Sequence, residues 1–265
     1  MKIRKAVIPA AGLGTRVLPA SKAIPKEMLP IVDKPVIQYI VEEAVQAGIE
    51  EILIITSRGK GAIEDHFDRA PELESRLEAA GKTSLLEQVK GIAGLANISF
   101  IRQKETKGLG HAVLCAREFV GNEPFAVLYG DDVILGEHSA TGELCAAYQK
   151  HQKGVVGIKE VEHALIHKYS SLKAEPLHTC GSTGAAEFLV TDMIEKPKTP
   201  EEVLPYYSIL GRCVLPVSYT HLFPPHRSQT RKPFCSGTSA LRRRATSIFC
   251  ALPCRCMAPA PTTAP

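Results

Sequence analysis

The order of apolar and polar positions over the first two hundred residues predicts alternating β-strands and α-helices. Short apolar runs predict strands at 5–9, 51–56, 98–102, 125–129 and 154–160, and the continuous run at 51–56 is typical of a parallel strand covered on both faces. Apolar residues spaced three or four apart, which is the spacing of one helix face, occupy 35–47, 60–67, 71–94, 110–119 and 141–152. Residues 185–217 are more β-rich and irregular. We therefore predict an α/β fold with a Rossmann-like, doubly wound mixed sheet, whose active site should lie beyond the carboxyl ends of its strands.

The net charge of +4 conceals an uneven distribution along the chain. Lys and Arg number 32 against 28 Asp and Glu, but no acidic residue follows Glu202. Residues 214–265 hold seven basic residues, so residues 1–213 hold 32 − 7 = 25 basic residues against 28 acidic ones, a balance of −3. We therefore expect two parts, a weakly acidic domain over 1–213 and a basic tail over 214–265.

The tail differs from the body in more than charge. It holds eight of the 19 prolines and four of the eight cysteines, and no apolar period persists through it. The spacing Cys250-x3-Cys254-x-Cys256 is a poor match to zinc sites, and the basic triplet Arg242–Arg244 is typical of a solvated surface rather than of nucleic-acid binding. We expect the tail to be disordered or non-native, and we expect no nucleic-acid partner.

The chain shows no signal for a membrane. No apolar run approaches the ~20 residues of a membrane-spanning helix, and residues 1–7 lack the apolar stretch of a secretory signal. The expected location is the cytoplasm.

A glycine-containing turn follows the first predicted strand. Ala10-Ala11-Gly12-x-Gly14-Thr15-Arg16 combines small residues, which let backbone N–H groups approach a phosphate, with a fixed positive charge. A dinucleotide-binding Rossmann turn is the alternative. Val17 stands where that motif needs its third glycine, which counts against the alternative.

The segment after this turn cannot start an α-helix at once, because Pro19, Pro25 and Pro30 interrupt it. We expect a long, extended, proline-restrained loop that covers a triphosphate. Its lysines could simply be solvated, but Lys26 beside the glycine turn is the candidate for phosphate contact.

Two further strand ends carry candidate chemistry. Asp131 and Asp132 follow Gly130 after an apolar strand, and carboxylates there can hold Mg²⁺ against substrate phosphates; a plain turn is the alternative. Gln103 and Gly108 precede the predicted helix at 110–119. Glycine there lets the backbone lie against a base, and the Gln amide suits a pyrimidine edge, although a plain helix start explains the same residues.

The motif that joins these features resembles the sugar-1-phosphate nucleotidylyltransferases. It is Gly12-x-Gly14-Thr15-Arg16-x2-Pro19-x5-Pro25-Lys26-x3-Pro30-x2-Asp33-Lys34-Pro35. Residues 22–30 and 107–112 are most similar to the bacterial members that act on UTP and glucose 1-phosphate, and Glu195-Lys196-Pro197 and Gly211-Arg212 extend the match. The resemblance covers about residues 1–213 and implies the nucleotide-diphospho-sugar transferase type of fold.

The resemblance also implies a reaction, in which a uridylyl group passes from UTP to glucose 1-phosphate with release of pyrophosphate, and a cytoplasmic homo-oligomer that uses Mg²⁺. The implied roles are catalysis by Arg16 and Lys26, Mg²⁺ binding by Asp131, nucleotide binding by Ala10, Ala11, Gly12, Gly14, Thr15, Gln103, Gly108 and Asp132, and sugar-phosphate binding by Ser170, Glu195 and Lys196. His111 is expected to be structural.

Two departures from the family pattern keep other functions open. Ser170 stands where family members have a glycine against the sugar, and beyond Gly211-Arg212 the family's second acidic metal ligand gives way to the acid-free tail. The alternatives are a thymidylyltransferase acting on the same sugar phosphate and an inactive remnant that binds nucleotide or sugar.

Overall fold

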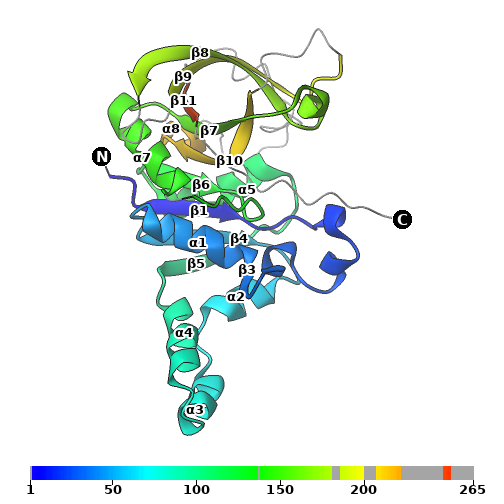
Figure 1. Ribbon diagram of the computed structural model, residues 1–265, viewed down its shortest axis with the longest axis vertical. Helices are drawn as coiled ribbons and strands as arrows, with labels where there is room; N and C mark the ends of the chain where they lie inside the picture. Colours follow the sequence, from blue (N-terminus) through cyan, green and yellow to red (C-terminus); the bar gives the residue numbers. More distant parts are fainter. Residues whose placement is uncertain (1, 137, 181–185, 200–206, 222–246, 252–265) are drawn as a thin grey trace.

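The computed structural model describes the chain apart from residues 1, 137, 181–185, 200–206, 222–246 and 252–265 (Figure 1). Its main feature is a nine-stranded sheet in the order β5-β4-β1-β6-β10-β7-β11-β9-β8. The first half is parallel and is built from β1 (Lys5–Pro9), β4 (Glu51–Thr56), β5 (Asn97–Arg102) and β6 (Phe125–Leu128). Strands β1, β4 and β6 are buried on both faces, whereas the edge strand β5 alternates between exposed and partly buried residues.

The second half of the sheet is mixed. Its strands are β7 (Val155–Glu160), β8 (Ser170–Cys180), β9 (Ala186–Glu195), β10 (Tyr207–Leu215) and β11 (Ser247–Ala251). β10 runs antiparallel to both β6 and β7, while β11 is parallel to β7 and antiparallel to β9. The predicted mixed α/β sheet is therefore confirmed, and β10 is the strand that joins its two halves.

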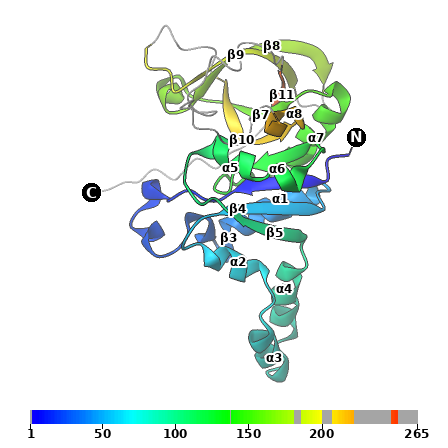
Figure 2. The same ribbon diagram turned by 180° about the vertical axis from the view of Figure 1, so that it is seen from behind.

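Helices cover the two faces of the parallel half (Figures 1 and 2). On one face α1 (Val36–Gln46) and α7 (Ala140–His151) pack on Ala6 and Ile8 of β1. On the other face α5 (Leu109–Cys115) and α6 (Arg117–Val120) pack around Val7. Alternate residues of β1 thus point to opposite faces, and the two helical layers leave the strand ends as the open edge.

Two predicted helices are each divided in two. The stretch 71–94 forms α3 (Pro71–Ala79) and α4 (Thr83–Ala93), because Gly81 adopts φ +65° in the turn between them. The stretch 110–119 forms α5 and α6, which meet at Ala116. α3 and α4 project from the sheet below α2 (Gly61–Phe67), as Figures 1 and 2 both show.

The loop after β1 is not extended, which corrects our expectation. It contains three single-turn 3-10 segments, η1 (Thr15–Val17), η2 (Ala20–Lys22) and η3 (Lys26–Met28), followed by the hairpin of β2 (Pro30–Ile31) and β3 (Lys34–Pro35). The prolines prevent a continuous α-helix, but a 3-10 turn needs only one i to i+3 hydrogen bond. Carbonyl groups of Gly14, Pro19 and Pro25 accept those bonds.

The boundary predicted after residue 213 falls inside β10, which continues to Leu215 and is followed by α8 (Ser218–His221). The remaining described tail residues form β11. The rest of the tail lies outside the described residues, so its predicted nature stays a prediction. Among the described residues, no helix is long and apolar enough to cross a membrane.

Candidate active site

The glycine turn after β1 and the acidic turn after β6 lie together at the open edge of the sheet. Lys26 Nζ forms an ion pair with Asp131 Oδ2 across 105 residues of sequence. A Cβ atom added to Gly12 would lie 3.8 Å from this ammonium group, so Gly12 leaves the backbone beside Lys26 open. The two charged groups that the sequence assigns to phosphate and metal thus meet at neighbouring strand ends.

The glycine turn is fixed by its own backbone. Gly14 adopts φ +70°, and its carbonyl oxygen accepts a hydrogen bond from Ser21 Oγ at 2.7 Å. A Cβ on Gly14 would approach Ser21 Cβ to 3.1 Å, so only glycine fits this crossing without displacement. Ala10 and Ala11 are buried at the base of the turn, where Ala10 N donates to Ile55 O at 2.8 Å and so extends the β1–β4 pairing.

Thr15 and Arg16 lie on η1 and are exposed. Within the described part of the chain, Arg16 has no hydrogen bond or ion pair with the protein. Its guanidinium group is therefore available to a ligand, and its catalytic role stays a prediction.

A buried ion pair beneath the site is the feature that sequence reasoning missed. Lys60 Nζ lies 2.9 and 2.8 Å from the two carboxylate oxygens of Glu27, and both side chains are almost fully buried. Burial raises the pKa of Glu27 and lowers that of Lys60, while their contact opposes both shifts. Glu27 directly follows Lys26 in η3, so the pair fixes the backbone that carries Lys26.

Gly130 brings the acidic turn close to β1. A Cβ there would lie 3.1 Å from Pro9 O and 3.5 Å from both Ala10 Cβ and Glu27 Cγ. The turn after β6 therefore packs directly on the end of β1 and on η3, which places Asp131 beside Lys26.

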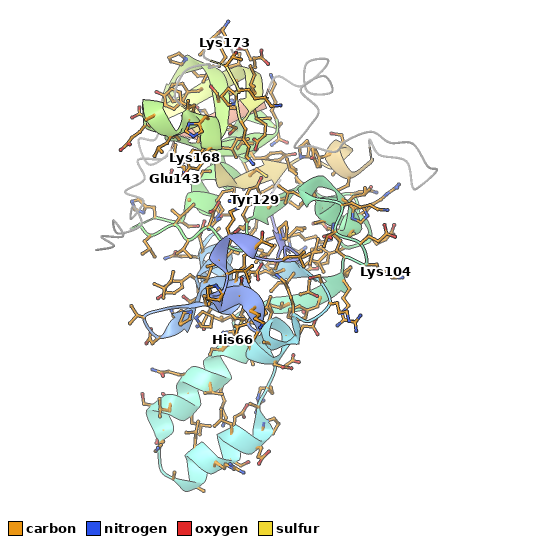
Figure 3. The ribbon with its side chains drawn as sticks, turned by 90° about the vertical axis from the view of Figure 1, so that its right-hand side faces the viewer. His66, Lys104, Tyr129, Glu143, Lys168 and Lys173 are labelled. Atoms are coloured by element: carbon orange, nitrogen blue, oxygen red, sulfur yellow. The ribbon has the colours of Figure 1, made fainter. Side chains whose placement is uncertain are left out.

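Asp132 is held from the other side by β10. Its carbonyl oxygen accepts a 2.6 Å hydrogen bond from Arg212, whose guanidinium group is buried and paired with Glu43 at 2.7 Å. The Asp132 carboxylate lies so close to Gly211 that a Cβ there would overlap it. Loss of surrounding water, followed by the charge of Asp131, raises the pKa of Asp132. Tyr129, which begins this turn, lies between the two halves of the molecule in Figure 3.

The base-binding candidates are neighbours. Gln103 follows β5 and is 5% exposed, with its amide nitrogen 3.3 Å from the carbonyl oxygen of Gly108 and 2.8 Å from His111 Nδ1. Gly108 adopts φ +89° immediately before α5. Gln103 is therefore in contact with the glycine turn that precedes α5 and with His111, while the base-binding role of Gln103 and Gly108 stays a prediction.

The three sugar-phosphate candidates lie together in the mixed half of the sheet. Ser170 at the start of β8 pairs in register with Glu195 at the end of β9, and Lys196 N donates to Tyr169 O at 2.9 Å. Glu195 and Lys196 are exposed. Within the described residues, no hydrogen bond or ion pair joins these three to Lys26 or Asp131.

Ser170 is occupied by contacts with β10. Its hydroxyl lies 3.0 Å from Ser208 Oγ and accepts a hydrogen bond from Ile209 N at 3.0 Å. The side chain is buried and directed to the neighbouring strand.

The Asp131 carboxylate suits a magnesium ion whose coordination shell is completed by oxygens of the substrate. The described residues contain no group of three or more His, Cys, Asp or Glu side chains that could hold a metal. Mg²⁺ in nucleotide sites typically takes one or two carboxylates and completes its shell with phosphates and water. The Asp131 side chain is 48% exposed beside Lys26, which is compatible with that arrangement.

Comparison with known proteins identifies the family. The model of the nucleotidyl transferase family matches residues 5–218. The UTP–glucose-1-phosphate uridylyltransferase of Bacillus subtilis (strain 168) is 55% identical over 214 residues, which are 80% of this chain and 70% of that protein.

Solved structures agree with this match. A UTP-bound UGPase from Acinetobacter baumannii superimposes with a TM-score of 0.83 at 34% identity, covering 96% of this chain and 87% of that one. A UDP-glucose pyrophosphorylase complexed with UDP-glucose gives a TM-score of 0.77 at 35% identity, covering 96% and 92%. The chain therefore belongs to the nucleotidyl transferase family, among the bacterial UTP–glucose-1-phosphate uridylyltransferases.

Proposed function

We propose that the chain transfers the uridylyl group of UTP to glucose 1-phosphate and releases pyrophosphate. The observation that carries the proposal is the meeting of Lys26 and Asp131 beside Gly12, at the edge where a doubly wound sheet binds its ligand. The relative from Bacillus subtilis, 55% identical to the chain, is named for this reaction.

In this reaction a phosphate oxygen of glucose 1-phosphate attacks the α-phosphorus of UTP. A new P–O bond forms as the bond to the β-phosphate breaks, and pyrophosphate leaves with the electron pair. Negative charge grows on the α-phosphoryl oxygens, so fixed positive charges are the main source of rate enhancement. Lys26 and Arg16 are the proposed sources, because both lie in the loop that follows β1, Arg16 in η1 and Lys26 in η3.

In the absence of substrate, Lys26 is paired with Asp131. A triphosphate carries more negative charge than one carboxylate and would draw the ammonium group away from Asp131. That carboxylate would then be free for Mg²⁺, which in such sites neutralises phosphate charge. Asp131 is the proposed metal ligand, and Asp132, held by Arg212, contributes to nucleotide binding.

Glu195 and Lys196 are the proposed contacts for the sugar hydroxyls and the sugar phosphate. Both are exposed at the end of β9, so a ligand can reach them. The hydroxyl of Ser170 is held by Ser208 and Ile209 of β10, which reduces the obstacle that a side chain in place of glycine presents to the sugar.

The thymidylyltransferase alternative is not favoured, since the relative that shares 55% identity is a uridylyltransferase. The inactive remnant differs from the enzyme in one measurable respect: it binds UTP but releases no pyrophosphate.

The test is pyrophosphate release from UTP and glucose 1-phosphate with MgCl2, with chromatographic detection of UDP-glucose and dTTP as the competing nucleotide. We expect Mg²⁺-dependent release that stops on chelation with EDTA. UTP binding without release would support the remnant, and faster turnover of dTTP would support the alternative enzyme. Size-exclusion chromatography of the same sample would test the predicted homo-oligomer.

A further inference from the structure

The hydrogen bonds around Gln103 determine which end of its amide group is left for a ligand. The amide nitrogen Nε2 lies 3.3 Å from the carbonyl oxygen of Gly108 and 2.8 Å from Nδ1 of His111. A carbonyl oxygen can only accept a hydrogen bond. The NH2 end of the amide must therefore face Gly108, and the opposite orientation would place two oxygens against each other.

This orientation assigns the proton of His111. Since the amide nitrogen donates, Nδ1 of His111 must accept, so the ring is neutral with its proton on Nε2. Gln103 then uses both amide hydrogens within the protein. Its oxygen Oε1 has no hydrogen-bond partner among the described residues and presents a fixed acceptor.

The start of α5 holds both partners of the amide. Gly108 has φ +89° and ψ −179°, a conformation that essentially only glycine adopts. Its backbone therefore aims the carbonyl oxygen at Gln103. His111 lies in the first turn of the same helix, so its ring and the Gly108 carbonyl are fixed relative to each other.

We propose that His111 is a positioning residue that makes the site select uracil over cytosine. The inference rests on the proposed function and on Gln103 as the residue that contacts the base. Uracil carries a hydrogen on N3, which a fixed Oε1 can accept, whereas cytosine has a lone pair at N3 that the same oxygen repels. Thymine shares the N3 hydrogen, so this device does not separate UTP from dTTP.

The proposal is tested by two matched variants. H111F keeps a ring of similar size but removes the acceptor, whereas H111N keeps an acceptor close to the position of Nδ1. For wild type and both variants we would measure the ratio of kcat/KM for UTP to that for CTP. The ratio of the two dissociation constants, from calorimetric titration, reports on selectivity without turnover.

We expect H111F to lower the UTP-to-CTP ratio by about tenfold or more, because the amide then keeps only its longer, 3.3 Å bond to the Gly108 carbonyl and rotates more easily to offer its NH2 group to cytosine. H111N should keep most of the wild-type ratio. Thermal unfolding checks that both variants fold. If H111F does not fold, H111A is the second variant that removes the acceptor.

An unchanged ratio in H111F would overturn the proposal. An equal loss in H111F and H111N would also overturn it, because the ring and not its acceptor would then be responsible. A wild-type chain that binds UTP selectively but releases no pyrophosphate would refute the proposed function alone, since the binding ratios of the variants would still decide the role of His111.

Discussion

Lys26 and Asp131 carry opposite charges at one sheet edge, and each compensates the other in the structure. Under the proposed function this pair must open when a triphosphate enters. A substitution of Lys26 therefore separates function from folding. Substrate binding and chemistry both need its charge, whereas the stability of the fold depends little on one partly exposed ion pair.

The first prediction concerns the variant K26M, which retains the side chain's apolar length but removes its charge. We expect kcat to fall by about a hundredfold or more, the usual effect of losing a group that stabilises transition-state charge, with little change in thermal unfolding. K90M, on the exposed face of α4, is the matched control. Equal activity of K26M and K90M in the pyrophosphate assay would contradict the role of Lys26.

The second prediction concerns Gly211, where an added Cβ would overlap the Asp132 carboxylate and lie 3.0 Å from Tyr129 Cβ. We expect G211A to lower the free energy of unfolding by about 1–3 kcal/mol, as overpacking does, and to weaken UTP binding by shifting Asp132. At Gly154 the nearest atoms would lie at ordinary distances of 3.5 and 3.9 Å, so G154A is the control. Urea unfolding of both variants measures the difference, and equal midpoints would refute the steric argument.

At the scale of elements, the buried pair of Glu27 and Lys60 joins η3 to the residue before α2. The third prediction is that K60M lowers the free energy of unfolding by about 3–5 kcal/mol, because Glu27 stays buried without its partner. The double variant E27M/K60M should regain much of this loss. K34M, which breaks the partly exposed pair with Glu42, should cost about 1 kcal/mol or less.

The pH dependence of K60M follows from the same burial. Burial raises the pKa of Glu27 above its ordinary value of 4.5 in the folded chain, and removing Lys60 takes away an interaction that lowers it. The folded variant then binds a proton more tightly than the unfolded chain does. Its stability relative to wild type should rise as the pH falls from neutral toward 4.5. A deficit that grows on acidification would contradict this sign.

The same elements show what the sequence could predict. Strands β1, β4 and β6 are continuous apolar runs typical of a parallel sheet, and the carboxyl ends of parallel strands lie at the same edge, so the approach of Lys26 to Asp131 could be expected. The pair of Glu27 and Lys60 could not, because both are polar residues in non-periodic segments that only the tertiary fold brings together. The 3-10 turns after β1 were missed for a related reason: prolines exclude a helix but do not distinguish an extended chain from single turns.

At the scale of the whole molecule, β10 connects a parallel half that carries Lys26, Asp131 and Gln103 to a mixed half that carries Glu195 and Lys196. Figures 1 and 2 show the mixed half above β10 and the parallel half below it. Arg212 of β10 binds the carbonyl oxygen of Asp132 and the carboxylate of Glu43, so side-chain contacts as well as the β6–β10 pairing join β10 to the acidic turn. A ligand that bridges the triphosphate and sugar residues would stabilise the whole fold rather than one element.

The fourth prediction is therefore a thermal shift. A ligand that binds only the folded chain stabilises it by about 2.7 kcal/mol at one hundred times its dissociation constant, so UTP should raise Tm. MgCl2 should increase that shift because the ion neutralises phosphate charge beside Asp131. D131N should lose the additional shift from Mg²⁺ while it keeps part of the shift from UTP alone, since Lys26 remains and no longer has a charged protein partner. Scanning fluorimetry with and without EDTA measures both effects, and a magnesium-dependent shift that survives in D131N would place the metal on other ligands.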